Sequence, residues 1–148
     1  MSPRTVLRWL LAALYIGFGA LHLVKAQSFL PIMPPWVPAP LLVVKLTGAC
    51  EIAGGLGLLT PPLRKAAGVG LALYAVCVFP ANLYHAFAGV HVPGLPSSWW
   101  YHAPRLAFQP VFVLWALYAG GVYPPLRSTS AAQASRWMRD SSRKPRAR

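Results

Sequence analysis

The chain has 148 residues, of which 56% are hydrophobic and only 11% are charged. A soluble domain is normally about 25% charged, so a water-soluble globule is disfavoured. The formal net charge is +12, from 14 Lys and Arg residues against two acids, Glu51 and Asp140. Half of the bases lie in one terminal tail, without the repeated aromatic or glycine-rich pattern that stacks on nucleobases, so no nucleic acid is expected as a partner. The class of protein that fits this composition is a small single-domain membrane protein with basic ends.

Four apolar stretches are long enough to cross a bilayer, since a membrane-spanning helix needs about 20 mostly apolar residues. These spans are expected at residues 5–26, 41–60, 65–87 and 104–123. Prolines fill the connections between them, and proline starts a helix well but cannot continue one. We therefore predict an all-α fold, a four-helix transmembrane bundle within residues 1–126, followed by a disordered basic cytoplasmic tail at 127–148.

Positive charge predicts the orientation of the spans, because Lys and Arg concentrate in cytoplasmic loops. Arg4 and Arg8 precede the first span. Arg64 and Lys65 lie between the second and third spans, and seven bases follow the fourth. We expect a multi-pass protein of a bacterial cytoplasmic membrane, in contact with the lipid bilayer, with both termini in the cytoplasm. A cleaved signal peptide ending near residues 24–26 is an alternative for the first stretch, and it leaves the remaining topology unchanged.

The sequence also contains a weak internal repeat. An offset of 63 residues aligns Pro61-Pro62-Leu63-Arg64 with Pro124-Pro125-Leu126-Arg127, and it pairs His22 with His85. Together with the order of the spans, this offset favours two tandem helix hairpins related by an axis along the membrane normal. Because the other matches are scattered, shared membrane composition is the alternative explanation.

Polar residues within the spans converge on one depth. With a rise of about 1.5 Å per residue, all four spans place polar groups in the outer half of the bundle. These residues are His22, Glu51, Asn82, His85, Arg105 and Gln109. An ionisable group inside a span costs about 2.5–3.5 kcal/mol, so we predict a ligand or proton-handling site, with Glu51 as the catalytic residue and the other five binding the ligand. Alternatively, these side chains only hydrogen-bond the helices together.

Glu51 is the one carboxylate expected inside the membrane, and its predicted partner is a base on another span: Arg105, His22 or His85. No metal site is expected, because the histidines lack the spacing of a zinc site. A haem held by His22 and His85 is a weaker alternative. Cys50 and Cys77 form no CxxC pair and are predicted to be ordinary buried thiols.

The ordered set of motifs resembles the DoxX-like family of small four-helix membrane proteins. The motifs extend over about residues 6–123 and comprise Gly19-Ala20-Leu21-His22, Met33–Pro40, Thr47–Leu59, Phe79-Pro80-Ala81-Asn82 and Arg105–Gln109. Where the family usually reads Arg-Leu-Pro-Leu-Gln, this chain reads Arg-Leu-Ala-Phe-Gln followed by Pro110. The resemblance implies quinone-coupled oxidation of sulfur compounds or a thiol redox complex, although other relatives act as assembly factors.

The leading hypothesis is therefore a redox-associated subunit of a quinone-linked oxidoreductase. Its outer-half pocket would hold a quinone-like head group, and a redox or membrane protein partner would supply or take the electrons. No covalently bound cofactor is expected, and a homo-oligomer is compatible with the sequence. The alternative is a non-enzymatic scaffold or assembly factor that binds a partner membrane protein through small-residue helix faces. A transporter is weaker, because the cytoplasmic half offers no polar path.

Overall fold

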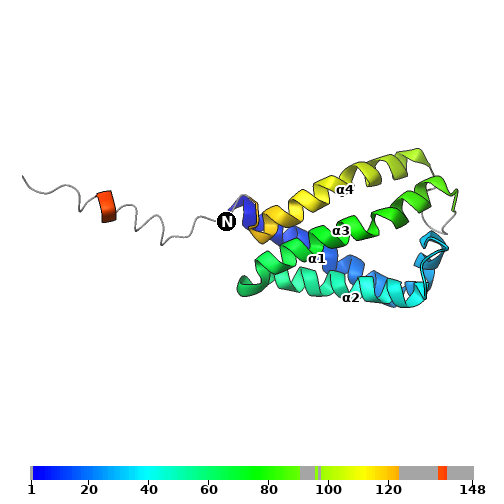
Figure 1. The fold of residues 1–148 in the computed structure, drawn as a ribbon, viewed down its shortest axis with the longest axis horizontal. Helices are drawn as coiled ribbons and strands as arrows, with labels where there is room; N and C mark the ends of the chain where they lie inside the picture. Colours follow the sequence, from blue (N-terminus) through cyan, green and yellow to red (C-terminus); the bar gives the residue numbers. More distant parts are fainter. Residues whose placement is uncertain (1, 91–95, 97, 124–136, 140–148) are drawn as a thin grey trace, which may run out of the picture.

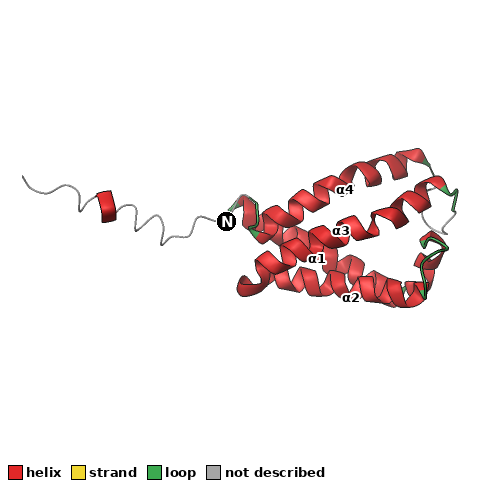
Figure 2. Cartoon of the chain, viewed as in Figure 1, coloured by secondary structure: helices red, strands yellow, loops and turns green. Residues whose placement is uncertain are grey.

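The computed structural model describes residues 2–90, 96, 98–123 and 137–139. They contain α1 (Pro3–Val24), η1 (Ala26–Ile32), α2 (Pro40–Leu59), η2 (Pro61–Leu63), α3 (Arg64–Phe87) and α4 (Trp99–Gly120), where η marks a 3-10 helix. No strand occurs among the described residues, so the predicted all-α class is confirmed (Figure 2). Of the predicted disordered tail, only 137–139 is described, and these residues are helical; the rest of that prediction lies outside the described residues.

Helix boundaries follow local signals with one exception. α1 begins at Pro3, and the Ser2 side chain caps it by accepting a hydrogen bond from the Thr5 amide. α4 begins at Trp99, so the predicted start at residue 104 is wrong. Pro104 forfeits one backbone hydrogen bond inside α4. Aromatic packing offsets that loss, because the Trp99 ring lies 5.3 Å from the Phe87 ring of α3, centroid to centroid.

Among the described residues, three helical segments are long and apolar enough to cross a membrane: Pro3–Val24, Pro40–Leu59 and Pro61–Phe87. α4 matches α1 in length but is more polar in its first half, which carries His102, Arg105 and Gln109. That α4 also crosses the membrane therefore stays a prediction. Large apolar side chains face outward along the helices, as expected where lipid replaces water around a protein.

The helices pair in chain order, α1 with α2 and α3 with α4 (Figure 1). Glycines bring the paired backbones into contact. A Cβ atom added to Gly19 would lie 2.6 Å from the Gly48 carbonyl oxygen, and one added to Gly68 would lie 2.8 Å from the Gly120 Cα. Any side chain at these positions would push the two helices apart.

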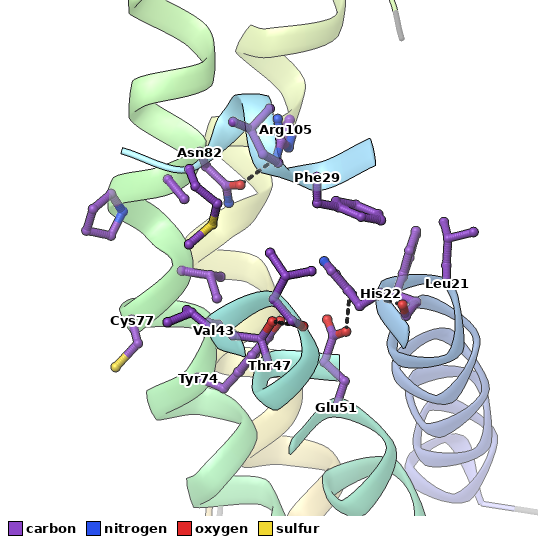
Figure 3. Close-up of a pocket in the computed structure, with 18 of the residues that line it drawn as sticks. Leu21, His22, Phe29, Val43, Thr47, Glu51, Tyr74, Cys77, Asn82 and Arg105 are labelled. Carbon is purple, nitrogen blue, oxygen red and sulfur yellow. Dashed lines mark hydrogen bonds and ion pairs between the residues drawn. The ribbon is translucent and has the colours of Figure 1, made fainter. Parts of the chain in front are cut away.

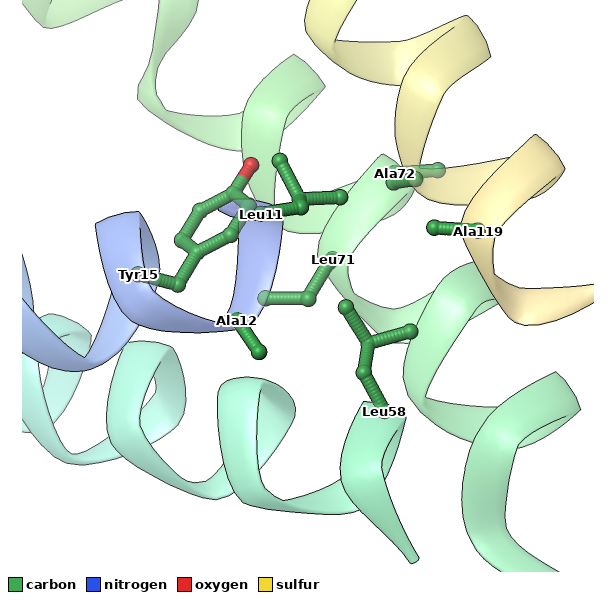
Figure 4. Packing of buried hydrophobic residues seen from close by; sticks show 8 residues of the cluster. Leu11, Ala12, Tyr15, Leu58, Leu71, Ala72 and Ala119 are labelled. Atoms are coloured by element: carbon green, nitrogen blue, oxygen red, sulfur yellow. The ribbon is translucent and has the colours of Figure 1, made fainter. Parts of the chain in front are cut away.

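One half of the molecule is filled by an apolar core. The start of α1, the α2–α3 connection and the end of α4 meet at this end (Figure 1). Its buried side chains come from all four α-helices (Figure 4): Leu11, Ala12, Tyr15, Leu58, Leu71, Ala72, Ala116 and Ala119. Below this core, the Arg8 Nε donates to the Ala119 carbonyl at 2.8 Å, and the Arg64 Nε donates to the Leu58 carbonyl at 3.3 Å. These two bases thus satisfy carbonyls at the ends of α4 and α2.

Candidate functional site

The other half of the molecule contains a half-open cavity of about 1170 Å³. All four α-helices line it, and η1 and the loop after η1 close one side. Most of the lining is aliphatic or aromatic, as is usual for small-molecule sites, with a few polar groups that converge on the space. Five of the six predicted site residues are among those polar groups: His22, Glu51, Asn82, Arg105 and Gln109. The sixth, His85, is buried behind Arg105.

The first polar group of the cavity joins α1 to α2. His22 Nδ1 lies 2.7 Å from Glu51 Oε2 and 3.0 Å from the Phe18 carbonyl oxygen. Both neighbours are acceptors, so Nδ1 carries the proton and donates. The other ring nitrogen, Nε2, faces the space between the helices (Figure 3). His22 is therefore oriented by the carboxylate and the carbonyl, and it presents one free nitrogen to an occupant of the cavity.

The second polar group joins α3 to α4 around Arg105. One terminal guanidinium nitrogen, Nη1, lies 2.6 Å from His85 Nδ1, and the other, Nη2, donates to Asn82 Oδ1 at 2.6 Å (Figure 3). A guanidinium can only donate, so His85 Nδ1 accepts and the proton of the neutral ring sits on Nε2. The His85 ring also packs edge-on against His102, with 4.8 Å between the ring centroids.

A short relay of amides continues this second group into the helix backbone. The Asn82 amide donates to Gln109 Oε1 at 3.1 Å, and the buried Gln109 amide donates to the Ala75 carbonyl. Pro80 has no amide proton, so the Val76 carbonyl loses its helical hydrogen bond. Gln109 bonds the neighbouring carbonyl of Ala75. The relay fixes the Asn82 side chain, which in turn holds Arg105.

Glu51 and Arg105 belong to different polar groups. Of the three predicted partners for Glu51, the structure selects His22, and no hydrogen bond or ion pair joins the His22–Glu51 group to the Arg105 group among the residues described. Each group connects the two helices of one pair, α1 with α2 or α3 with α4. The cavity between the two groups is therefore flanked by donors and acceptors on two sides.

Several residues that the sequence analysis did not single out also shape the site. Tyr74 lies near Glu51 and Thr47 (Figure 3). The Phe29 ring of η1 packs on the His22 ring with 4.2 Å between centroids. Lys25 lines the cavity from the exposed end of α1. Tyrosines and phenylalanines are common in membrane helices, so only their positions in the fold distinguish these from the rest.

Cys50 and Cys77 are free thiols, but the prediction that they are buried was wrong, because both are exposed. Cys77 also lines the cavity. The metal prediction stays open. In the part of the chain that the structure describes, no group of three or more His, Cys, Asp or Glu side chains could hold a metal ion. His91 lies outside the described residues.

Fold and site together define a small helical protein with membrane-length helices and a polar-flanked apolar cavity. A family model described as a domain of unknown function (DUF8561) matches residues 11–120, and the chain belongs to that family. The matched region contains all six predicted site residues. No curated protein and no solved structure gives a significant match to the chain.

The amide relay gives a first prediction. Changing Gln109 to leucine leaves the Ala75 carbonyl and the Asn82 amide without their partners, which is expected to destabilise the protein by about 1–3 kcal/mol. Thermal unfolding in detergent measures the effect. Gln27→Leu, at an exposed position on η1, is the matched control and is expected to change Tm little. Equal Tm values for the two variants would show that the relay does not stabilise the fold.

Proposed function

We propose that the protein is a four-helix transmembrane bundle of DoxX-like type that binds a quinone-like amphiphile as a subunit of a membrane redox complex. The observation that carries the ligand site is the cavity of about 1170 Å³ with polar groups on two sides. Its apolar walls suit an isoprenoid or alkyl tail, and its volume is above the usual range of about 300–1,000 Å³ for small-molecule sites, which leaves room for such a tail. The redox assignment itself rests on the DoxX-like motifs.

The two polar groups match the chemistry of a quinone head group, which carries two oxygens on opposite sides of one ring. Arg105 can donate to one oxygen. On the other side, the free Nε2 of His22 accepts from a quinol hydroxyl when the ring is neutral, and donates to a quinone carbonyl when the ring is protonated. The Glu51 carboxylate holds the ring in place through its hydrogen bond with Nδ1. A partner protein would supply or take the electrons.

The proposed orientation places the cavity in the outer half of the membrane and both termini in the cytoplasm. Arg4, Arg8 and Arg64 lie at the end of the molecule with the apolar core. At the cavity end, Trp36 and Trp100 are exposed, as expected for aromatic side chains at a membrane–water boundary. The bases at the core end favour the cytoplasmic surface, and the exposed tryptophans at the cavity end suit a membrane boundary on either side.

The scaffold alternative uses small-residue helix faces, and only part of these faces is occupied inside the chain. Gly19, Gly48 and Gly55 lie in the α1–α2 contact, and Gly68 and Gly120 lie between α3 and α4. Two other small residues, Ala49 and Ala53, are exposed on α2. A partner helix could pack on this exposed face, so the alternative stands beside the ligand proposal.

Cavity occupancy can be tested without altering any polar group. We expect the protein purified in mild detergent to retain quinone in its lipid extract, and a short-chain quinone to raise its Tm, because a ligand that binds only the folded state stabilises it. Ala81 lines the cavity, so Ala81→Phe should abolish the rise in Tm.

Ala107→Phe is the matched control, since Ala107 is exposed on α4 and lies outside the cavity lining. The control variant should keep both the bound quinone and the Tm rise. If the wild-type protein yields no quinone and shows no Tm rise, or if both variants respond alike, the proposed function is contradicted.

A further inference from the structure

Arg105 carries a positive charge that no carboxylate neutralises among the described residues. Its two terminal nitrogens bond to His85 Nδ1 and Asn82 Oδ1, and both of these acceptors are uncharged. Glu51 is the one acid in the described part of the chain, and it bonds to His22 on the other helix pair. The guanidinium therefore lines the cavity without a counter-ion.

The cavity lining as a whole also carries more positive than negative charge. Two permanent bases, Lys25 and Arg105, line it against a single acid, Glu51, whose carboxylate is already hydrogen-bonded to His22. Most of the remaining lining is apolar, and a cation in such surroundings is costly unless an opposite charge accompanies it. A negatively charged group in the cavity would remove this cost.

The guanidinium is also held ready to bind an oxygen anion. Asn82 and His85 fix its two terminal nitrogens at 2.6 Å each, and Gln109 fixes Asn82. These two contacts use only part of the donor set, because a guanidinium has five N–H groups. A fixed planar fork with free donors binds an ionised oxygen better than a neutral one.

We propose that the cavity selects an amphiphile whose head group carries an ionised oxygen, and that Arg105 recognises this charge. This inference rests on the proposed ligand cavity and narrows its ligand class to acidic head groups joined to an apolar tail. A quinone with an ionised ring hydroxyl and a fatty acid share this chemistry. Lys25, at the exposed end of α1, favours entry of the same charge.

Matched pairs of ligands test the charge directly in the purified protein. The first pair is a 2-hydroxy-3-alkyl-1,4-naphthoquinone, which is ionised at neutral pH, and its neutral 2-methoxy analogue. The second pair is oleic acid and methyl oleate. We expect the ionised member of at least one pair to bind about tenfold more tightly, since a charge-assisted contact replaces a neutral one. Titration calorimetry gives the two dissociation constants.

Substitutions in the protein identify the residue that recognises the negative charge of the ligand. Arg105→Gln should remove the preference for the ionised ligand, whereas Arg105→Lys should keep part of it. Lys45→Gln is the matched control, because Lys45 is exposed on α2 and does not line the cavity, so the same loss of charge should leave the preference intact. If Arg105→Gln lowers Tm sharply, the comparison of ionised and neutral ligands in the wild type and in Arg105→Lys still decides the inference.

The outcomes separate this inference from the proposed function. Equal affinities within both pairs, with a neutral quinone still bound, would overturn the charge selection and leave quinone binding standing. Binding of oleic acid over methyl oleate, with no quinone of either kind bound, would support the charge selection and contradict the quinone proposal. Loss of preference in Lys45→Gln but not in Arg105→Gln would overturn the role of Arg105.

Discussion

Gly19→Ala is expected to destabilise the protein by about 1–3 kcal/mol, although alanine is normally the better helix former. The reason is the contact between α1 and α2. The new methyl carbon would lie 2.6 Å from the Gly48 carbonyl oxygen and 2.8 Å from the Ile52 Cγ1 atom. A backbone oxygen cannot move aside as a flexible side chain can, so the two helices must separate. Because His22 and Glu51 bond across this same contact, the cavity should be disturbed as well.

Gly17→Ala provides a control on the same helix. A Cβ atom added to Gly17 meets nothing within 4 Å, so this variant should be neutral or slightly more stable. Unfolding of both variants in detergent, followed by tryptophan fluorescence during heating, measures the difference. If Gly19→Ala unfolds at the same temperature as Gly17→Ala, the backbone contact between α1 and α2 is looser than the structure shows.

Glu51→Gln is expected to weaken binding of a quinone-like ligand by about tenfold while leaving the fold intact. Glutamine keeps an oxygen that can accept the hydrogen bond from His22 Nδ1, so the contact between α1 and α2 survives. The variant loses only the negative charge. Without that charge the hydrogen bond from His22 Nδ1 is no longer charge-assisted, so the ring is held less firmly toward a ligand in the cavity. Tm should change by far less than the affinity.

Cys50→Ala is the matched control for this substitution. Cys50 precedes Glu51 on α2, is exposed and does not line the cavity, so the variant should bind as the wild type does. The measurement is a quinone titration of each purified variant, with Tm recorded in parallel. Unfolding of Glu51→Gln without a separate effect on affinity would instead favour a structural role for the His22–Glu51 pair.

The polar cluster could be predicted from the sequence because polar residues are conspicuous in apolar spans. Their positions along each span place them at one depth, and His22, Glu51, Asn82 and Arg105 indeed line one cavity. Depth follows from counting residues along a helix of known rise. The predicted all-α class follows from the same apolar pattern.

The partner of each polar residue could not be predicted in this way. The depth of a residue in the membrane does not determine the rotation and tilt of its helix, so depth alone does not distinguish among the three candidate bases for Glu51. The close Gly19–Gly48 contact, which positions α1 against α2 and brings His22 to Glu51, is visible only in the structure. The start of α4 was also missed, because Pro104 is a strong local stop signal and the packing of Trp99 on Phe87 is visible only in three dimensions.

The central claim, that the cavity between the two polar groups binds a quinone-like amphiphile, is tested most directly by an experimental structure in lipid with added quinone. We expect density for a head group between His22 and Arg105, with its tail among the apolar residues of the cavity. The His22–Glu51 and Arg105–Asn82 contacts should persist. A closed cavity in which Glu51 and Arg105 contact one another, or quinone bound elsewhere on the protein, would contradict the claim.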